Sequence, residues 1–179
     1  MPDKILALVN TTGRQAASVA RVAAAVGYQV RAQVFVQDGP VAQEVQDLPN
    51  TTIIHGSLTD DDLLARLFQG AQKAFVNTLS WDDEAAIGKR VANAAKKAGV
   101  QHYVYSSMPD HGIYGHGWPS LPHWSVKYTI EQYVRQVSGT AFGMKSSIDA
   151  SPRSGCRRRS CTPVSTIITS RVSRFRCFA

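Results

Sequence analysis

The first 145 residues contain no cysteine, and no apolar run in the chain approaches the length of a membrane span. All three cysteines (Cys156, Cys161 and Cys177) lie beyond that point, so the sequence predicts neither a disulfide framework nor a cysteine-ligated zinc site in the main part of the chain. The first apolar run, Ile5–Val9, is too short for the core of a signal peptide. We therefore expect a protein of the cytoplasm and nucleus, with no membrane partner.

The main part of the chain also has almost no net charge. Of the formal net charge of +7, residues 1–145 contribute +1 (13 Lys and Arg against 12 Asp and Glu) and residues 146–179 contribute +6 (7 against 1). We therefore expect the folded part to make no direct contact with DNA. The run Arg157–Arg159 is typical of a nuclear-import or nucleic-acid-binding patch, and a disordered basic tail is the simpler alternative.

Short β-rich runs alternate with helical segments between residues 4 and 137. The runs that predict strands are Lys4–Asn10, Gln29–Phe35, Thr51–His55, Ala74–Asn77 and His102–Ser106. The segments that predict helices are Arg14–Val26, Val41–Asp47, Asp60–Phe68, Asp83–Ala98 and His123–Val137. This alternation predicts an α/β fold with a doubly wound parallel sheet of the Rossmann type. We place this domain at residues 1–142 and a basic Ser- and Arg-rich tail at residues 143–179. Asp82 or Asp83 is expected to cap the fourth helix, and Gly99 to end it.

The turn after the first strand has the spacing of a dinucleotide-binding loop. Such a loop needs small residues because the chain turns tightly, the backbone approaches a pyrophosphate and the helix packs closely on the strand. Here the three positions are Asn10, Gly13 and Ala16; Asn tolerates left-handed backbone, and Ala is nearly as small as Gly. Free N–H groups at the start of the following helix would receive the diphosphate. The expected phosphate loop consists of Asn10, Thr12, Gly13, Arg14, Gln15 and Ala16.

Four segments carry a more specific resemblance. They are Val9–Ser18, Val30–Val34, Ala86–Lys89 and His102–His111, of which the run Ser106–His111 is the most specific. Over about residues 3–142 the sequence resembles the NmrA family, fungal negative regulators of nitrogen metabolite repression that are related to the short-chain dehydrogenases. The resemblance implies a Rossmann domain followed by a smaller domain. It also implies binding of oxidised NAD or NADP in preference to the reduced forms, and control of a GATA-type zinc-finger transcription factor.

The second strand lacks the residues that usually choose between the two cofactors. An acid at its end holds the ribose hydroxyls of NAD, and an Arg accommodates the 2′-phosphate of NADP, but here Phe35 and Gln37 occupy this region. Arg14 is the nearest candidate cation, and a solvated surface role for it is equally consistent. We therefore predict weak discrimination between NAD and NADP. The remaining expected cofactor contacts are Asn77 and Thr78, on the nicotinamide side, and Ser106.

The catalytic tyrosine of short-chain reductases is missing. These enzymes use Tyr-x-x-x-Lys on a helix and a Ser at the end of the fifth strand, where the Tyr donates a proton and the Lys lowers its pKa and holds the ribose. Here His123 stands four residues before Lys127, and Ser107 ends the strand. Histidine can donate a proton near neutral pH, so a reductase that uses these three residues stays an open alternative. We favour cofactor binding without turnover, with Lys127 keeping its ribose contact. The acidic run Asp60–Asp62 predicts a helix cap and not a metal site.

The tail departs from the family pattern. The resemblance implies a sixth strand after Phe142 and then a motif resembling Tyr-Ala-Gly-Ile-Tyr-Asn-Asn-Asn-Phe, which is absent. When the codons of Thr162–Ser170 are read one base earlier, with serine as TCN, all nine permit that motif in order. We therefore hypothesise that a retained intron or a frameshift begins at about Gly143. The sheet would then be incomplete after strand five, with an uncovered edge that invites aggregation or dimerisation.

Overall fold

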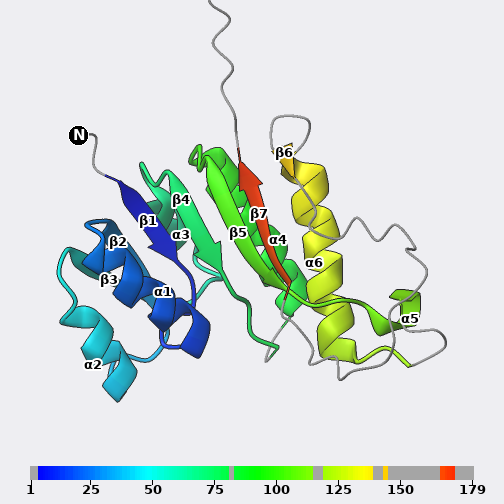
Figure 1. Cartoon of the computed structure of the whole chain (residues 1–179), viewed down its shortest axis with the longest axis horizontal. Coiled ribbons are helices and arrows are strands. Elements are labelled where there is room, and N and C mark those ends of the chain that lie inside the picture. The colour runs from blue at the N-terminus through cyan, green and yellow to red at the C-terminus, as the bar shows by residue number, and fades with distance from the viewer. Residues whose placement is uncertain (1–3, 81–82, 115–118, 139–142, 145–165, 172–179) are drawn as a thin grey trace, which may run out of the picture.

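A computed structural model of the chain describes residues 4–80, 83–114, 119–138, 143–144 and 166–171. Strands and helices alternate in it as far as residue 107 (Figure 1). The strands are β1 (Ile5–Leu8), β2 (Gln29–Val34), β3 (Thr51–His55), β4 (Lys73–Val76), β5 (His102–Ser107), β6 (Gly143–Met144) and β7 (Thr166–Arg171). The helices are α1 (Arg14–Ala25), α2 (Pro40–Gln46), α3 (Asp61–Phe68), α4 (Glu84–Lys97), α5 (His111–Tyr114) and α6 (Pro122–Ser138). All the elements expected from the sequence are present, and α5, β6 and β7 are additional.

Strands β1 to β5 form a parallel sheet in the order β3-β2-β1-β4-β5. The chain passes from one side of β1 to the other between β3 and β4, so the switch point of the sheet lies between β1 and β4. Ligands of such sheets bind outside the carboxyl ends of the strands at this point. In Figure 1 these carboxyl ends lie at the lower edge of the molecule. The doubly wound Rossmann type is therefore confirmed.

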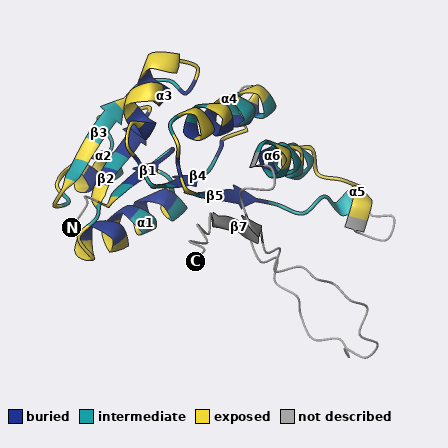
Figure 2. Ribbon diagram, turned by 90° about the horizontal axis from the view of Figure 1, so that it is seen from above, coloured by how far each residue is buried: buried dark blue, intermediate teal, exposed yellow. Residues whose placement is uncertain are grey.

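Helices cover both faces of the sheet (Figure 2), and each face has its own hydrophobic cluster beneath its helices. On one face α1 packs through small side chains, among them the fully buried Ala16 and Ala20. On the other face α3, α4 and α6 contribute Leu63, Val91 and Ile130, all fully buried. Because its contact residues are alanines, α1 lies close to the sheet, and its first turn is held directly beyond the end of β1.

The predicted helix ends are confirmed. The side chain of Asp60 accepts a hydrogen bond from the N–H of Asp62 at 2.9 Å, so the acidic run there caps α3. Asp83 caps α4 by accepting a hydrogen bond from the N–H of Ala86 at 3.0 Å. Gly99 follows α4 with a φ of 77°, the left-handed conformation that ends a helix. The alternative cap, Asp82, lies outside the described residues.

The outer edge of β5 is covered, which corrects the expectation of a sheet that stops at strand five. β7 pairs antiparallel with β5 along its whole length, and β6 pairs with β7. The first four residues of β7 are β-branched, and such side chains favour strands, while an edge strand offers unpaired backbone groups to any such segment. Part of the expected tail therefore joins the sheet. The run Arg157–Arg159 lies outside the described residues, and the domain boundary at residue 142 and the frameshift stay predictions.

Candidate functional site

In the turn between β1 and α1, Asn10 and Gly13 each meet one requirement of a glycine-rich loop. Asn10 adopts the left-handed conformation, with a φ of 53°, and its carbonyl accepts a hydrogen bond from the N–H of Gly13 at 3.0 Å. Gly13 itself is extended, and a Cβ there would lie 3.2 Å from the carbonyl oxygen of Asn10. Gly13 therefore has to stay small, whereas Asn10 replaces a glycine because Asn tolerates positive φ. Asn10 thus has the left-handed backbone that its residue type was expected to tolerate.

The start of α1 offers backbone N–H groups to a ligand. The first helical hydrogen bond runs from the N–H of Ala17 to the carbonyl of Gly13, at 2.9 Å. No side chain makes an N-cap hydrogen bond at this helix start. The N–H groups of residues 14–16 therefore point out of the helix toward the carboxyl edge of the sheet. Together with the positive end of the helix dipole, they can bind an anion such as a phosphate.

A buried glutamine that the sequence analysis missed holds this turn in place. Gln33 is 1% exposed, and its Oε1 accepts a hydrogen bond from the N–H of Asn10 at 2.8 Å. Its Nε2 donates to the carbonyl of Gly56 at 2.8 Å, and its own carbonyl accepts from the N–H of Thr11 at 2.9 Å. Gln33 therefore ties the turn after β1 to the turn after β3. Its burial could not be predicted from the sequence, because Gln29, Arg31 and Gln33 alternate along the strand and the first of them is exposed.

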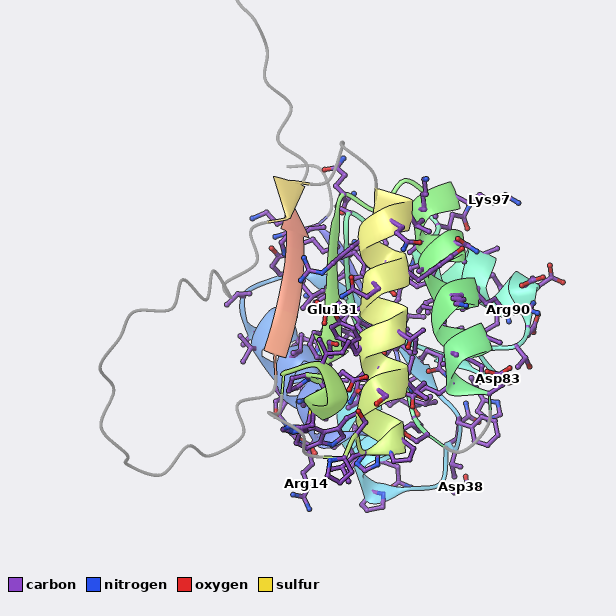
Figure 3. All side chains as sticks on the ribbon, turned by 90° about the vertical axis from the view of Figure 1, so that its right-hand side faces the viewer. Arg14, Asp38, Asp83, Arg90, Lys97 and Glu131 are labelled. Carbon is purple, nitrogen blue, oxygen red and sulfur yellow. The ribbon has the colours of Figure 1, made fainter. Side chains whose placement is uncertain are left out.

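The end of β2 presents apolar side chains to solvent. Phe35 is 63% exposed and Val36 is 59% exposed, and Gln37 is exposed as well. An aromatic side chain in such a position can stack on a flat ring system. Arg14 is exposed, and Figure 3 places it with Asp38 at the same edge of the molecule. The expected adenosine contacts Phe35, Gln37 and Arg14 are thus all accessible at the carboxyl edge of the sheet.

The end of β4 meets the turn after β1. Asn10 Nδ2 donates to the carbonyl of Asn77 at 2.6 Å, so this expected contact borders the phosphate loop. Thr78 is buried, and its side chain points inward. Its hydroxyl donates to Glu84 Oε1 at 2.5 Å and lies 2.9 Å from the hydroxyl of Tyr105. Burial raises the pKa of Tyr105 above its ordinary value, so Tyr105 keeps its proton and can donate it to Thr78.

Lys127 and Glu84 form a buried ion pair that links α6 to α4. Lys127 Nζ donates to Glu84 Oε1 at 2.7 Å and to the carbonyl of Thr78 at 2.6 Å. The side chains of Lys127 and Glu84 are 14% and 3% exposed. Burial alone raises the pKa of Glu84, but hydrogen bonds from Lys127, Thr78 and Ser80 outweigh it, and the pKa lies below its ordinary value. Glu84 could not be predicted from the sequence, because its partner lies 43 residues away.

Two other expected contacts meet at the first turn of α1. Ser106, near the end of β5, donates from Oγ to Gln15 Oε1 at 2.7 Å. Thr12 is exposed on the turn, and Ala16 is buried beneath it. The structure therefore brings together the expected phosphate-loop residues and Ser106, at the carboxyl edge beside the switch point.

The three residues of the possible reductase are not assembled around one point. Ser107 is fully buried, and its Oγ donates to the backbone carbonyl of Lys127 at 3.4 Å. The ammonium of Lys127 is directed at Glu84 and Thr78. His123 is exposed and has its ring edge-on to Trp124, with the centroids 6.2 Å apart. Ser107 and Lys127 are therefore neighbours, whereas the imidazole of His123 lies on the surface.

Neither a metal centre nor a membrane span is found in the described part of the chain. Its His, Cys, Asp and Glu side chains form no group of three or more that could ligate a metal ion. None of its helices combines the length and the apolar character that crossing a bilayer requires.

Residues 2–146 match the family model of the NmrA-like family. The chain belongs to this family. It is 56% identical over 137 residues to the nitrogen metabolite repression protein nmrA of Emericella nidulans, over 75% of this chain and 39% of that protein. It is 47% identical over 163 residues to nmr of Neurospora crassa, over 76% and 33% of the two chains. The chain thus spans well under half the length of these NmrA-like relatives.

Solved structures and an oxidoreductase extend the comparison. The crystal structure of the negative transcriptional regulator NmrA in complex with NADP has a TM-score of 0.72 and 54% identity, over 76% of this chain and 43% of that chain. The NAD complex of NmrA gives the same values. The NmrA-like family domain-containing oxidoreductase FrzB of Cladobotryum sp is 33% identical over 143 residues, covering 74% of this chain and 42% of that protein. The family therefore includes proteins named as regulators and proteins named as oxidoreductases.

Proposed function

We propose that this chain is the nucleotide-binding part of a negative transcriptional regulator of nitrogen metabolite repression. The observation that carries the proposal is the turn at Asn10 and Gly13, which opens the first N–H groups of α1 to a diphosphate. The NAD and NADP complexes of NmrA, 54% identical to this chain, support this choice of ligand. The chain covers less than half of those proteins, so the regulatory role belongs to the whole protein.

Each half of the nucleotide has its own expected contacts. The diphosphate lies on the backbone of residues 12–16, where Ser106 and Gln15 border it. The adenosine lies against Phe35 and Gln37, and the exposed Arg14 reaches a 2′-phosphate when NADP binds. On the nicotinamide side the contacts are Asn77, Thr78 and Lys127. Lys127 Nζ donates to Glu84, to the Thr78 carbonyl and, at 3.3 Å, to the Thr78 hydroxyl, so it contributes to the ribose by exchanging this longest bond for one to a ribose oxygen.

The oxidised forms of NAD and NADP are the preferred ligands in this proposal. The oxidised nicotinamide ring carries a positive charge, which the ammonium of Lys127 alone would repel. Glu84 lies 2.7 Å from that ammonium and compensates its charge, so the site tolerates a cationic ring. The nucleotide is bound without turnover, because the position four residues before Lys127 holds the exposed His123 in place of a tyrosine.

The partner of the complete regulator is a GATA-type zinc-finger transcription factor. The protein acts in the cytoplasm and the nucleus, through that partner and without direct binding to DNA or to a membrane. The near-neutral charge of residues 1–145 supports a protein partner over DNA.

Calorimetry on the full chain tests the nucleotide proposal. NAD+ and NADP+ should bind with similar affinity, and both should bind more tightly than NADH and NADPH. Arg14→Ala should weaken NADP+ by roughly threefold and leave NAD+ unchanged, because only NADP+ has the 2′-phosphate. Arg21→Ala, on the solvent side of α1, is the matched control. Equal or tighter binding of NADH would contradict the oxidised preference, and equal effects on both nucleotides would contradict the role of Arg14.

A reductase is the second candidate function. The 33% identity to the oxidoreductase FrzB favours it, as does the pairing of Ser107 with the backbone of Lys127. In this case His123 donates the proton and Lys127 holds the ribose. Consumption of NADPH in the presence of a panel of carbonyl compounds, abolished by Lys127→Ala and by His123→Ala, would support it. A chain that binds NADPH and consumes none with any compound would rule it out.

A further inference from the structure

A groove between α3 and α4 lies away from the candidate nucleotide site. Both helices belong to the face of the sheet opposite α1 (Figure 2). Its floor includes small side chains, Ala65 from α3 and Ala94 and Ala98 from α4. The groove has a volume of about 1090 Å³, just above the range of about 300–1,000 Å³ for small-molecule pockets. A floor of this kind lets the backbone of another molecule come close.

Positive charge surrounds this floor. Arg66 from α3 and Lys89, Arg90 and Lys97 from α4 line the groove, against one lining carboxylate, Asp61. Lys89 and Lys97 stand two i,i+4 steps apart, so they lie along one side of α4. Figure 3 shows Arg90 and Lys97 projecting outward from this helix. The groove is therefore a cationic channel between two helices.

Most of this charge is available to a ligand. Arg90 and Asp61 are 2.7 Å apart, but their side chains are 46% and 78% exposed, and exposed pairs of this kind are weak. Lys89 lies over the ring of Tyr133, 5.5 Å from its centroid, which leaves its ammonium protons free to donate. Arg66 and Lys97 make no side-chain hydrogen bond or ion pair with another described residue. Four cations are therefore available to the carboxylates of a partner, and Asp61 is the one lining carboxylate that pairs with any of them.

We propose that this groove binds an acidic segment of a partner protein. Carboxylates of the segment pair with the cations along the rim, and its backbone packs on the alanines of the floor. The amides of Gln69 and Asn93, also in the lining, can donate to and accept from a peptide backbone. A nucleic acid fits less well, since single strands bind by stacking successive bases on aromatic side chains, and the lining contributes one such side chain, Tyr133, whose ring already lies under the ammonium of Lys89. The groove acts independently of nucleotide binding.

Fluorescence anisotropy on the full chain tests the proposal. The probe is a labelled peptide with glutamates at helical spacing, and its glutamine counterpart serves as the neutral probe. The acidic peptide should bind, and the neutral one should not. The double variant Arg66→Glu/Lys97→Glu should weaken binding by at least about tenfold. The control Lys4→Glu/Arg21→Glu changes the net charge equally on the other side of the protein and should leave affinity unchanged. Circular dichroism confirms folding, and the milder Arg66→Gln/Lys97→Gln is used if the reversal unfolds the chain.

Hydrogen exchange with the acidic peptide bound locates the site. Residues 61–70 and 86–98 should gain protection, with or without NADP+, so a failure to bind nucleotide leaves this result unaffected. Equal weakening by the control variant, or protection confined to residues 146–179, would overturn the proposal. An oligonucleotide of matched charge that displaces the peptide and binds more tightly would assign the groove to nucleic acid instead.

Discussion

Replacing Glu84 with alanine should destabilise the protein strongly, because it leaves the ammonium of Lys127 without its carboxylate. The side chains of Lys127 and Glu84 are 14% and 3% exposed, so water cannot replace the lost partner fully. Removing one member of a buried pair costs about 3–5 kcal/mol. The hydroxyls of Thr78 and Ser80, which donate to the two carboxylate oxygens at 2.5 and 2.7 Å, also lose their acceptor. We therefore expect a loss within that range.

Urea unfolding of the full chain measures this loss, and a double-mutant cycle assigns it to the pair. Lys127→Met in the background of Glu84→Ala should restore part of the stability, because no charge is then buried alone. The matched control is Glu44→Ala, which removes the exposed carboxylate paired with Arg21 and should leave stability almost unchanged. A loss for Glu84→Ala no larger than that of the control, or two losses that simply add in the double variant, would refute the reasoning.

Three further predictions concern Glu84, Asn10 and Gln33. The pKa of Glu84 is lowered in the folded state, so its contribution to stability is complete above the unfolded pKa of about 4.3 and is lost as pH falls through the folded pKa. In urea titrations at several pH values, Glu84→Gln should therefore reduce the dependence of the free energy of unfolding on pH in this acidic range. An unchanged pH dependence would contradict the assignment. Asn10→Val and Asn10→Gly both lose the hydrogen bond to the Asn77 carbonyl, but Asn10→Val should cost about 1–2 kcal/mol more in thermal unfolding, because a β-branched residue resists a φ of 53°. Equal melting temperatures of the two variants would contradict a role of the backbone conformation. Gln33→Leu should cost about 1–3 kcal/mol and speed hydrogen exchange at the N–H of Asn10, since it leaves that group and the carbonyl of Gly56 without partners; unchanged exchange would show that Gln33 does not hold the turn.

Most of the fold could be predicted because its signals are local. Apolar runs gave the five parallel strands, and Asp60, Asp83 and Gly99 marked helix ends that depend only on neighbours in sequence. The exception is β7. Its β-branched run was visible in the sequence, but its pairing with β5 depends on which edge of the sheet is left open. That information is not local, and the edge was therefore expected to be bare.

The site was predicted only where its chemistry is carried by one segment. Asn10 and Gly13 stand within a single turn, so their spacing revealed it. Gln33 and Glu84 act on partners 23 and 43 residues away along the chain, and neither residue type is unusual where it stands. The environment of Lys127 depends on the same long-range contact. Burial of a polar side chain becomes visible only once the sheet and its helices are in place.

Nucleotide binding depends above all on the first N–H groups of α1, which are proposed to receive the diphosphate. The most direct test is a titration of the ¹⁵N-labelled full chain with NADP+, followed through the amide resonances of Gly13, Arg14, Gln15 and Ala16. These resonances should shift first and most strongly, and inorganic pyrophosphate should shift the same set. A well-folded chain whose resonances at residues 13–16 stay unchanged at saturating nucleotide would contradict this role of the N–H groups.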